Sequence, residues 1–167
     1  MPTGQTQPFI VDANVLIDYL DSDLDALSIL SRKVSPVNIG RGAFDKVPRL
    51  NDTEAARFHI QIITPTLEIM GEAANKRGSL AYDDHETLLL AKINGWTCIT
   101  NDKALRRECG TEKVAILWGL EPLRILVTDK FMKAERAITI ARTIHANNPM
   151  FVTADIIARF ESQISQL

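Results

Sequence analysis

The sequence of 167 residues has few of the features that would place it in a specialised class at once. Its two cysteines, Cys98 and Cys109, are too few for a disulfide framework and lack metal-ligand spacing. No apolar run approaches the roughly 20 residues that cross a bilayer. The segment Met1 to Pro8 is polar and lacks the apolar core of a secretory signal. We therefore expect a cytoplasmic protein without a membrane segment.

The charge balance excludes a protein that grips nucleic acid over its whole surface. The formal net charge is −2, with 46% hydrophobic and 24% charged residues, which is an ordinary globular composition. A nuclease stays open, because a cluster of metal-binding carboxylates subtracts positive charge from the total. The sequence has no repeats, no low-complexity tracts and no linker. We predict one domain over residues 1–167, in which 120–167 is a helical C-terminal extension packed on the rest.

Short apolar segments alternate along the chain with helical patterns. The predicted strands are 9–11, 37–39, 60–63, 97–100 and 114–118. The predicted helices are a region over 15–30, then 43–47, 53–59, 65–77, 84–94, 103–108, 120–128, 133–146 and 153–165. This alternation predicts an α/β fold with three layers, α/β/α, around a central parallel sheet of four to five strands.

Acidic residues stand where two of these strands end. Asp12 follows the strand 9–11, and Asp102 follows the strand near 97–100. Ligands of open parallel sheets bind at the carboxyl ends of the strands, so these acids should converge. A third acid, Asp84, opens the helix that precedes the strand near 97–100. We expect the three carboxylates to lie close enough to share a hard cation such as Mg²⁺.

Helix capping is the alternative explanation for each acid. Asp is a common N-cap residue, and both Asp12 and Asp102 precede helices. Asp83 and Glu86 have the spacing of a capping box, in which each side chain satisfies the other's free backbone N–H. That interpretation leaves Asp84 without a capping role and favours it as the functional acid.

Two segments together resemble the signatures of PIN domains. Residues 11–18 read Val-Asp-Ala-Asn-Val-Leu-Ile-Asp, which is similar to the opening strand and turn of that family. Residues 84–102 begin a helix with Asp, continue to Ala-Lys-Ile-Asn-Gly and end in a strand leading to Thr-Asn-Asp. Either motif alone is weak, but both occur in the family's order. The resemblance covers about residues 8–120.

The resemblance implies a metal-dependent endoribonuclease that cleaves single-stranded RNA. It implies that Asp12, Asp84 and Asp102 hold Mg²⁺ or Mn²⁺. The family has a fourth acid on the helix after the second strand, and this chain departs from the pattern there. Lys46 precedes the apolar Val47, where the family has Glu, and Asp45 lies one position away. Asp45 is thus the candidate fourth catalytic acid, or the site has three acids. Glu68 and Glu72 follow the third strand and are expected on an ordinary surface helix.

Other residues receive supporting roles. Asn14 is expected to hold the Asp12 turn or simply to start the helix, and Thr100 and Asn101 to position water or to bond locally. We expect RNA-backbone contacts from Lys46, Arg106 and Arg107, and core positions for Trp96 and Trp118. PIN nucleases are often toxins neutralised by a small antitoxin protein and commonly form homodimers, so the resemblance implies these partners as well.

Two readings from other classes stay open. One is a catalytically decayed PIN module that binds RNA or a protein partner, which Lys46 favours and a calorimetric metal titration would distinguish. The other is a phosphatase of the haloacid-dehalogenase type, which also begins with an apolar strand and an acidic turn. Its second Asp would be Asn14 here, and trapping with beryllium fluoride would test it.

Overall fold

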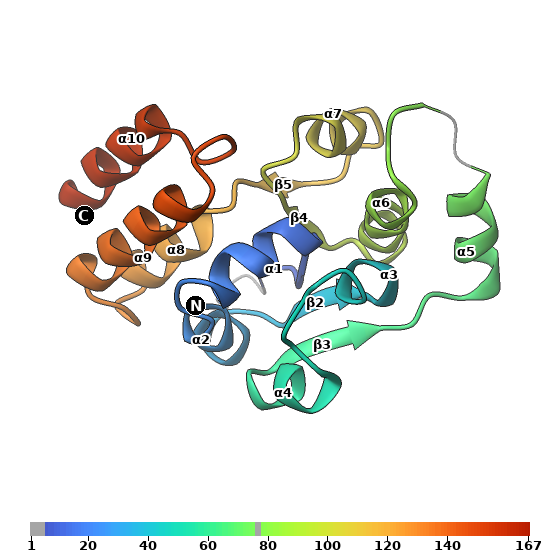
Figure 1. The fold of residues 1–167 in the computed structure, drawn as a ribbon, viewed down its shortest axis with the longest axis horizontal. Coiled ribbons are helices and arrows are strands. Elements are labelled where there is room, and N and C mark those ends of the chain that lie inside the picture. The colour runs from blue at the N-terminus through green and yellow to red at the C-terminus, as the bar shows by residue number, and fades with distance from the viewer. Residues whose placement is uncertain (1–5, 76–77) are drawn as a thin grey trace.

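A parallel sheet of five strands forms the centre of the described structure (Figure 1). The structure, a computed structural model, describes residues 6–75 and 78–167. The strand order is β3-β2-β1-β4-β5. The strands are β1 (Phe9–Val11), β2 (Val37–Gly40), β3 (Ile60–Ile63), β4 (Thr97–Ile99) and β5 (Ile116–Leu117). Each predicted strand is therefore present, with small differences at the ends.

The register places the carboxyl ends of the central strands side by side. β1 pairs in parallel with β2 on one side, Phe9 opposite Val37, and with β4 on the other, Val11 opposite Ile99. Parallel neighbours need a crossover connection, and helices supply it here. The residue that follows β1 and the residues that follow β4 therefore leave the sheet at the same edge.

Helices cover both faces of the sheet. They are α1 (Ala13–Leu20), α2 (Asp25–Lys33), α3 (Arg41–Phe44), α4 (Asp52–Arg57), α5 (Leu67–Ala74), α6 (Tyr82–Asn94), α7 (Lys103–Thr111), α8 (Glu121–Thr128), α9 (Ala134–Asn147) and α10 (Ala154–Ser165). Side chains alternate along β1, so Phe9 and Val11 join one buried core and Ile10 joins the other. The first core packs against α1, α2 and α8, and the second against α6 and α7. The predicted three-layer α/β/α architecture is confirmed.

Some helix boundaries differ from the sequence prediction. The region 15–30 is two helices, because α1 ends at Leu20 and the Asp23 side chain accepts a bond from the Asp25 N–H at 3.2 Å. α3 begins at Arg41 and is already complete at Phe44, so the prediction of 43–47 was displaced. α5 begins after Thr66, whose hydroxyl caps the Ile69 N–H at 3.3 Å, two residues later than expected. The predicted end of that helix, at residues 76–77, lies outside the described residues, as does the start of the polar segment at residues 1–5.

The C-terminal helices are attached to the first two helices by buried and polar contacts. The hydroxyl of the buried Tyr19 donates to the Gly119 carbonyl at 2.7 Å. The Asn148 amide donates to the Asp18 carboxylate at 3.0 Å, and Arg136 pairs with Asp23 at 2.8 Å. Apolar residues of α8, α9 and α10 also belong to the same core as β1. Within the described part of the chain, none of the helices has the length and apolar character needed to cross a membrane.

Candidate functional site

Asp12 is a buried acid at the carboxyl end of β1. It is 2% exposed and serves as the N-cap of α1, where its Oδ1 accepts a bond from the Val15 N–H at 2.8 Å. Its other oxygen accepts a hydrogen bond from the Thr100 hydroxyl. The capping interpretation is therefore right for Asp12. It does not compete with a functional role, because the cap also fixes the carboxylate at the sheet edge where ligands bind.

Thr100 and Asp102 continue this arrangement from β4. The fully buried Thr100 hydroxyl accepts a bond from the Asp102 N–H at 2.9 Å. Asp102 is the N-cap of α7, and its Oδ1 accepts from the Leu105 N–H at 2.7 Å. One hydroxyl thus links the backbone of one acid to the side chain of another. The local bonding expected for Thr100 is present in its bond from the Asp102 N–H, and the bond to Asp12 is an additional long-range contact.

The electrostatics place Asp84 in the same group. Burial raises the pKa of the Asp12 carboxyl to about 7, although the hydrogen bonds from Thr100 and Val15 act to lower it. The negative charges of Asp84 and Asp102 raise that pKa further. Asp84 stands half-buried in the first turn of α6. The three acids therefore occupy one region of the carboxyl edge of the sheet.

The carboxylates do not form a ready-made metal site. Within residues 6–75 and 78–167, no three acidic, histidine or cysteine side chains lie close enough to hold one ion. Metal binding by the three acids stays a prediction, and the caps give a physical reason for their present directions. Bonds from Val15 and Thr100 orient Asp12, and a bond from Leu105 orients Asp102.

The chemistry of the donor set nevertheless fits a hard divalent cation. Every candidate ligand is a carboxylate oxygen, the donor type that Mg²⁺ and Mn²⁺ favour. A carboxylate has about four acceptor positions, so a cap bond leaves the capped oxygens of Asp12 and Asp102 able to accept a cation as well.

Asp83 and Glu86 do not form the predicted capping box. The N-cap of α6 is Ala81, and no side-chain bond caps this helix. Asp83 instead forms an ion pair with Lys46 at 2.5 Å. Glu86 accepts a hydrogen bond from the Gly42 N–H at 3.0 Å. Tertiary partners from α3 and the residues just after it have replaced the local pairing that the spacing suggested.

Glu86 lies in a cradle that two glycines of the β2–α3 turn form. A Cβ on Gly40 would lie 2.6 Å from Glu86 Oε1, and one on Gly42 would lie 3.1 Å from Oε2. Burial raises the pKa of Glu86, whereas the Gly42 N–H and the Tyr82 hydroxyl lower it. Sequence reasoning missed this buried acid, and the pair of glycines after the second strand was the signal that could have indicated it.

The residues proposed near the fourth acid lie on the rim. Asp45 and Lys46 are both exposed, and Asp45 pairs with Arg41 at 3.6 Å. The negative charge of Asp45 acts on Glu86, where it helps to raise the pKa of that carboxyl. The charges that act on Asp12 are those of Asp84 and Asp102. The charge of Asp45 is therefore associated with Glu86, and not with the charges that act on Asp12.

The supporting residues divide into buried and exposed members. Asn14 is exposed on the first turn of α1. The side-chain Oδ1 of Asn101 accepts a bond from the Gly119 N–H at 2.9 Å, which joins the segment after β4 to the segment after β5. Glu68 and Glu72 are exposed on α5, in agreement with the surface helix predicted for them.

The basic candidates on α7 differ from each other. Arg107 is exposed and contacts Ser79 at 3.3 Å and Glu108 at 3.5 Å. The Arg106 guanidinium lies over the ring of Trp118, 3.3 Å from its centroid. The prediction that Trp118 is a core residue was wrong, since 47% of it is exposed, whereas Trp96 is partly buried against the second core.

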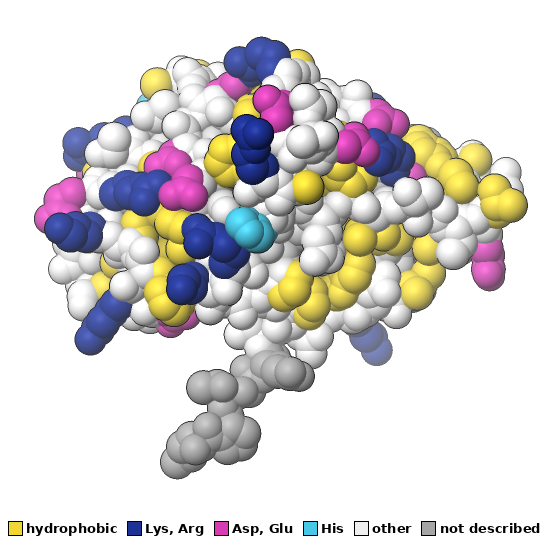
Figure 2. Space-filling view, turned by 90° about the horizontal axis from the view of Figure 1, so that it is seen from below, with side chains coloured by type: hydrophobic (Ala, Val, Ile, Leu, Met, Phe, Trp, Pro, Cys, Tyr) yellow, Lys and Arg dark blue, Asp and Glu magenta, His cyan; other side chains and the backbone are white. Residues whose placement is uncertain are grey.

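A separate hollow lies at the β3 edge of the sheet. It encloses about 610 Å³ between α2, α4 and β3, and its lining includes Arg32, Arg41, Asp52 and His59. Figure 2 views this side and shows Lys and Arg side chains gathered near a histidine. Arg41 is already paired with Asp52 at 2.7 Å, so part of the positive charge is neutralised. The hollow lies at the opposite edge of the sheet from β5 and apart from the three acids.

Comparison with known proteins places the fold. Neither a protein-family model nor a curated protein sequence matches the chain significantly. Among solved structures, the chain is similar to a PilT N-terminus domain protein from the hyperthermophilic archaeon Sulfolobus solfataricus P2. The TM-score is 0.53 and the sequence identity 13%, over 70% of this chain and 91% of that one. PIN is the abbreviation of PilT N-terminus, and the chain has a PIN-type fold.

Proposed function

We propose that this protein is a metal-dependent endoribonuclease of PIN type that cleaves single-stranded RNA. The observation that carries the proposal is the gathering of Asp12, Asp84 and Asp102 at the carboxyl edge of a PIN-type sheet. Three carboxylates in one region repel one another, and a divalent cation relieves that repulsion. Both sequence segments that resemble the family's signatures contribute acids to this group.

Asp12, Asp84 and Asp102 are the residues that would hold Mg²⁺ or Mn²⁺. A bound divalent cation supplies a water of lowered pKa and stabilises negative charge on the attacked phosphate. The chain itself supplies orientation. The Thr100 hydroxyl holds one oxygen of Asp12 and the backbone of Asp102, so both acids keep their direction during a reaction.

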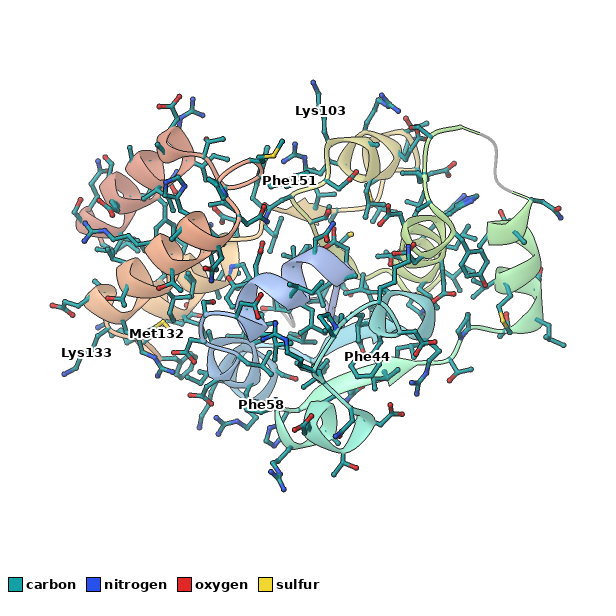
Figure 3. The ribbon with its side chains drawn as sticks, viewed as in Figure 1. Phe44, Phe58, Lys103, Met132, Lys133 and Phe151 are labelled. Atoms are coloured by element: carbon teal, nitrogen blue, oxygen red, sulfur yellow. The ribbon has the colours of Figure 1, made fainter. Side chains whose placement is uncertain are left out.

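The remaining roles fall to residues around this group. Asp45 is the candidate carboxylate for orienting the attacking water. Lys46, Arg106 and Arg107 are candidates for holding the RNA backbone, where positive side chains contact phosphates. Asn14 and Asn101 support the turns that carry Asp12 and Asp102. Lys103, the first residue of α7, projects outward from the protein (Figure 3) and adds positive charge beside Asp102.

A decayed module that binds RNA or a protein partner is the second candidate. The observation that favours it is the Lys46–Asp83 ion pair, which places an ammonium 2.5 Å from the residue that precedes Asp84 in the chain. A lysine ammonium near the acids would reduce the need for a metal, although the Lys46 side chain is exposed. Calorimetric titration with Mn²⁺ separates the two candidates, because the decayed module should release or absorb no heat of specific binding.

The proposal includes two partners on the strength of the family resemblance. One is a small antitoxin protein, and the other is a second copy of this chain in a homodimer. The toxin role would be supported by a small open reading frame next to this gene, if the protein that it encodes inhibits cleavage. Light scattering of the purified protein at several concentrations tests the dimer.

Cleavage of a panel of RNAs with Mg²⁺ or Mn²⁺ tests the enzyme directly. We expect the wild type to cut single-stranded RNA only when metal is present, and Asp12→Asn to be inactive. The matched control is Asp129→Asn, which changes an exposed acid at the end of α8 and should cleave normally. Equal cleavage by wild type and Asp12→Asn would point to a contaminating nuclease and remove the proposal's support.

A further inference from the structure

A small pocket adjoins the acids at the end of the last strand. It has a volume of about 190 Å³, and its lining includes Asn101, Trp118, Glu121, Arg159, Phe160 and Gln163. We call it the Trp118 pocket. Trp118 directly follows β5, and Asn101 directly precedes Asp102, so the pocket shares the carboxyl edge of the sheet with the candidate site. In Figure 1, β5 runs between α7 and the C-terminal helices, which supply the other walls.

The aromatic wall of the pocket is exposed and has a cation stacked on it. Trp118 is 47% exposed, although large aromatic side chains are usually buried in a core of this size. The Arg106 guanidinium lies 3.3 Å from the ring centroid. Arg106 Nη1 is buried, and among the described residues it has no hydrogen-bond partner. Arg106 does not line the pocket itself, so this buried nitrogen is not offered to a ligand there, and the guanidinium instead adds positive charge beside the ring.

The other walls carry hydrogen-bonding groups in fixed positions. Asn101 is held by the Gly119 N–H at 2.9 Å, and a Cβ on Gly119 would lie 2.4 Å from its Nδ2. Glu121 is held by Arg124 at 2.6 Å. Arg159 and Gln163 stand on the exposed face of α10. The pocket therefore combines a flat apolar surface, positive charge and several polar side chains.

We propose that the Trp118 pocket binds one base of a single-stranded RNA whose backbone passes the Asp12, Asp84 and Asp102 group. Single-stranded RNA is recognised by stacking of bases on aromatic rings and Arg planes, with hydrogen bonds to the base edges. Arg106 and Arg159 supply charge complementary to the neighbouring phosphates. The inference rests on the proposed function, and it gives the helical extension a role, because α10 supplies Arg159, Phe160 and Gln163.

RNA binding without metal tests the pocket separately from catalysis. The probes are fluorescein-labelled octamers of uridine, adenosine and cytidine, and an octamer of the same backbone without bases, measured by anisotropy in EDTA. We expect the wild type to bind at least one base-containing octamer about tenfold or more tightly than the abasic one. Trp118→Ala should abolish that difference, and Trp118→Phe should retain most of it.

Phe131→Ala is the matched control, since Phe131 is an aromatic residue of similar exposure, 42%, at the turn between α8 and α9. It should bind all probes as the wild type does. If Trp118→Ala does not fold, as judged by circular dichroism, Arg159→Ala on the exposed face of α10 replaces it and should weaken binding severalfold, more at low salt than at high salt.

The outcomes separate the pocket from the nuclease. RNA cleavage by the wild type, with equal octamer binding by wild type and Trp118→Ala, overturns the pocket and leaves the nuclease. Trp118-dependent preference for bases without any cleavage supports the pocket and removes the nuclease. Failure of the wild type to bind any octamer more tightly than the abasic chain overturns the pocket and leaves it available to a side chain of a protein partner.

Discussion

The hydroxyl of Thr100 donates a hydrogen bond to the carboxylate of Asp12, 88 positions earlier in the chain. The same oxygen accepts the Asp102 N–H at 2.9 Å. The Thr100 hydroxyl and the Asp12 carboxylate are almost fully buried, so neither can exchange their hydrogen bond for one with water. A single hydroxyl therefore determines the direction of one acid's side chain and of another acid's backbone.

Thr100→Val keeps the shape of this side chain and removes the hydroxyl. We expect it to lower the free energy of unfolding by about 1–3 kcal/mol, because the buried Asp12 carboxylate and the partly buried Asp102 N–H lose their partner. Urea unfolding at pH 7 measures this. Thr100→Ser restores the hydroxyl and should recover most of the stability, together with Mn²⁺ binding. If Thr100→Val is as stable as the wild type, the hydroxyl does not hold the two acids.

Asp12→Asn tests the cost of the buried acid. The folded-state pKa of Asp12, about 7, is above its ordinary value of 3.8, so the folded protein binds the proton more tightly. Stability is then lost as pH rises from about 4 through 7. Asn caps helices as well as Asp, so the cap remains. We expect the variant to be more stable than the metal-free wild type by about 1–3 kcal/mol at pH 8 and similar near pH 4.

Metal should stabilise the wild type but not the Asp12→Asn variant. Mn²⁺ binds only the folded wild type and should raise its Tm, whereas Asp12→Asn should show no such rise. Differential scanning calorimetry with and without Mn²⁺ checks both points. A variant that is less stable than the metal-free wild type by more than about 1 kcal/mol would favour a purely structural cap for Asp12.

Much of the fold could be predicted because its signals are local. Short apolar strands alternate with helices, and β1 and β4 each end at an acid. The neighbouring positions of Asp12 and Asp102 then follow from the geometry of parallel strands, without knowledge of any side-chain contact. The same reasoning gives the layer order, because strands that are apolar on both faces need helices on both sides.

The contacts that the sequence hid are tertiary. Asp83 and Glu86 have capping-box spacing, yet their partners are Lys46, just after α3, and Gly42 in α3. No local pattern reveals that α3 lies against α6. Trp118 has the sequence environment of a core residue, but it follows an edge strand of two residues, which leaves the ring exposed. Both errors arise where neighbours distant in sequence override a local preference.

The stability of the contact between α1 and the C-terminal helices should depend on pH, through the carboxyl group of Asp18. The pKa of Asp18 is raised to about 6. Burial is the largest cause, the hydrogen bond from the Asn148 amide acts to lower the pKa, and the negative charge of Asp21 acts to raise it. Because this pKa is above the unfolded value of 3.8, Asp18 costs stability as pH rises from about 4 through 6. We expect Asp18→Asn to be more stable than the wild type by roughly 1 kcal/mol at pH 8, with no gain at pH 4.

Thermal unfolding at both pH values measures the effect of Asp18→Asn. Asp129→Asn is the control, since it removes an exposed carboxylate and should change stability little at either pH. A gain of equal size at pH 4 and pH 8 would mean that the charge of Asp18 is not responsible.

The fourth acid is the remaining question at the site, and two variants on α3 and its end address it. If Asp45 orients the attacking water, Asp45→Asn should lower RNA cleavage tenfold or more while Mn²⁺ binding is retained.

If Lys46 instead occupies the place of the family's Glu, Lys46→Glu should tighten Mn²⁺ binding and raise cleavage. It would remove the cation paired with Asp83 at 2.5 Å and add a carboxylate. A charge about 4 Å away contributes up to roughly 4 kcal/mol at an effective dielectric of 20, although the exposure of Lys46 reduces this. Single-turnover cleavage and Mn²⁺ calorimetry on both variants distinguish the two cases. If neither variant changes either measurement, α3 and the residues after it lie away from the chemistry, and the site works with three acids.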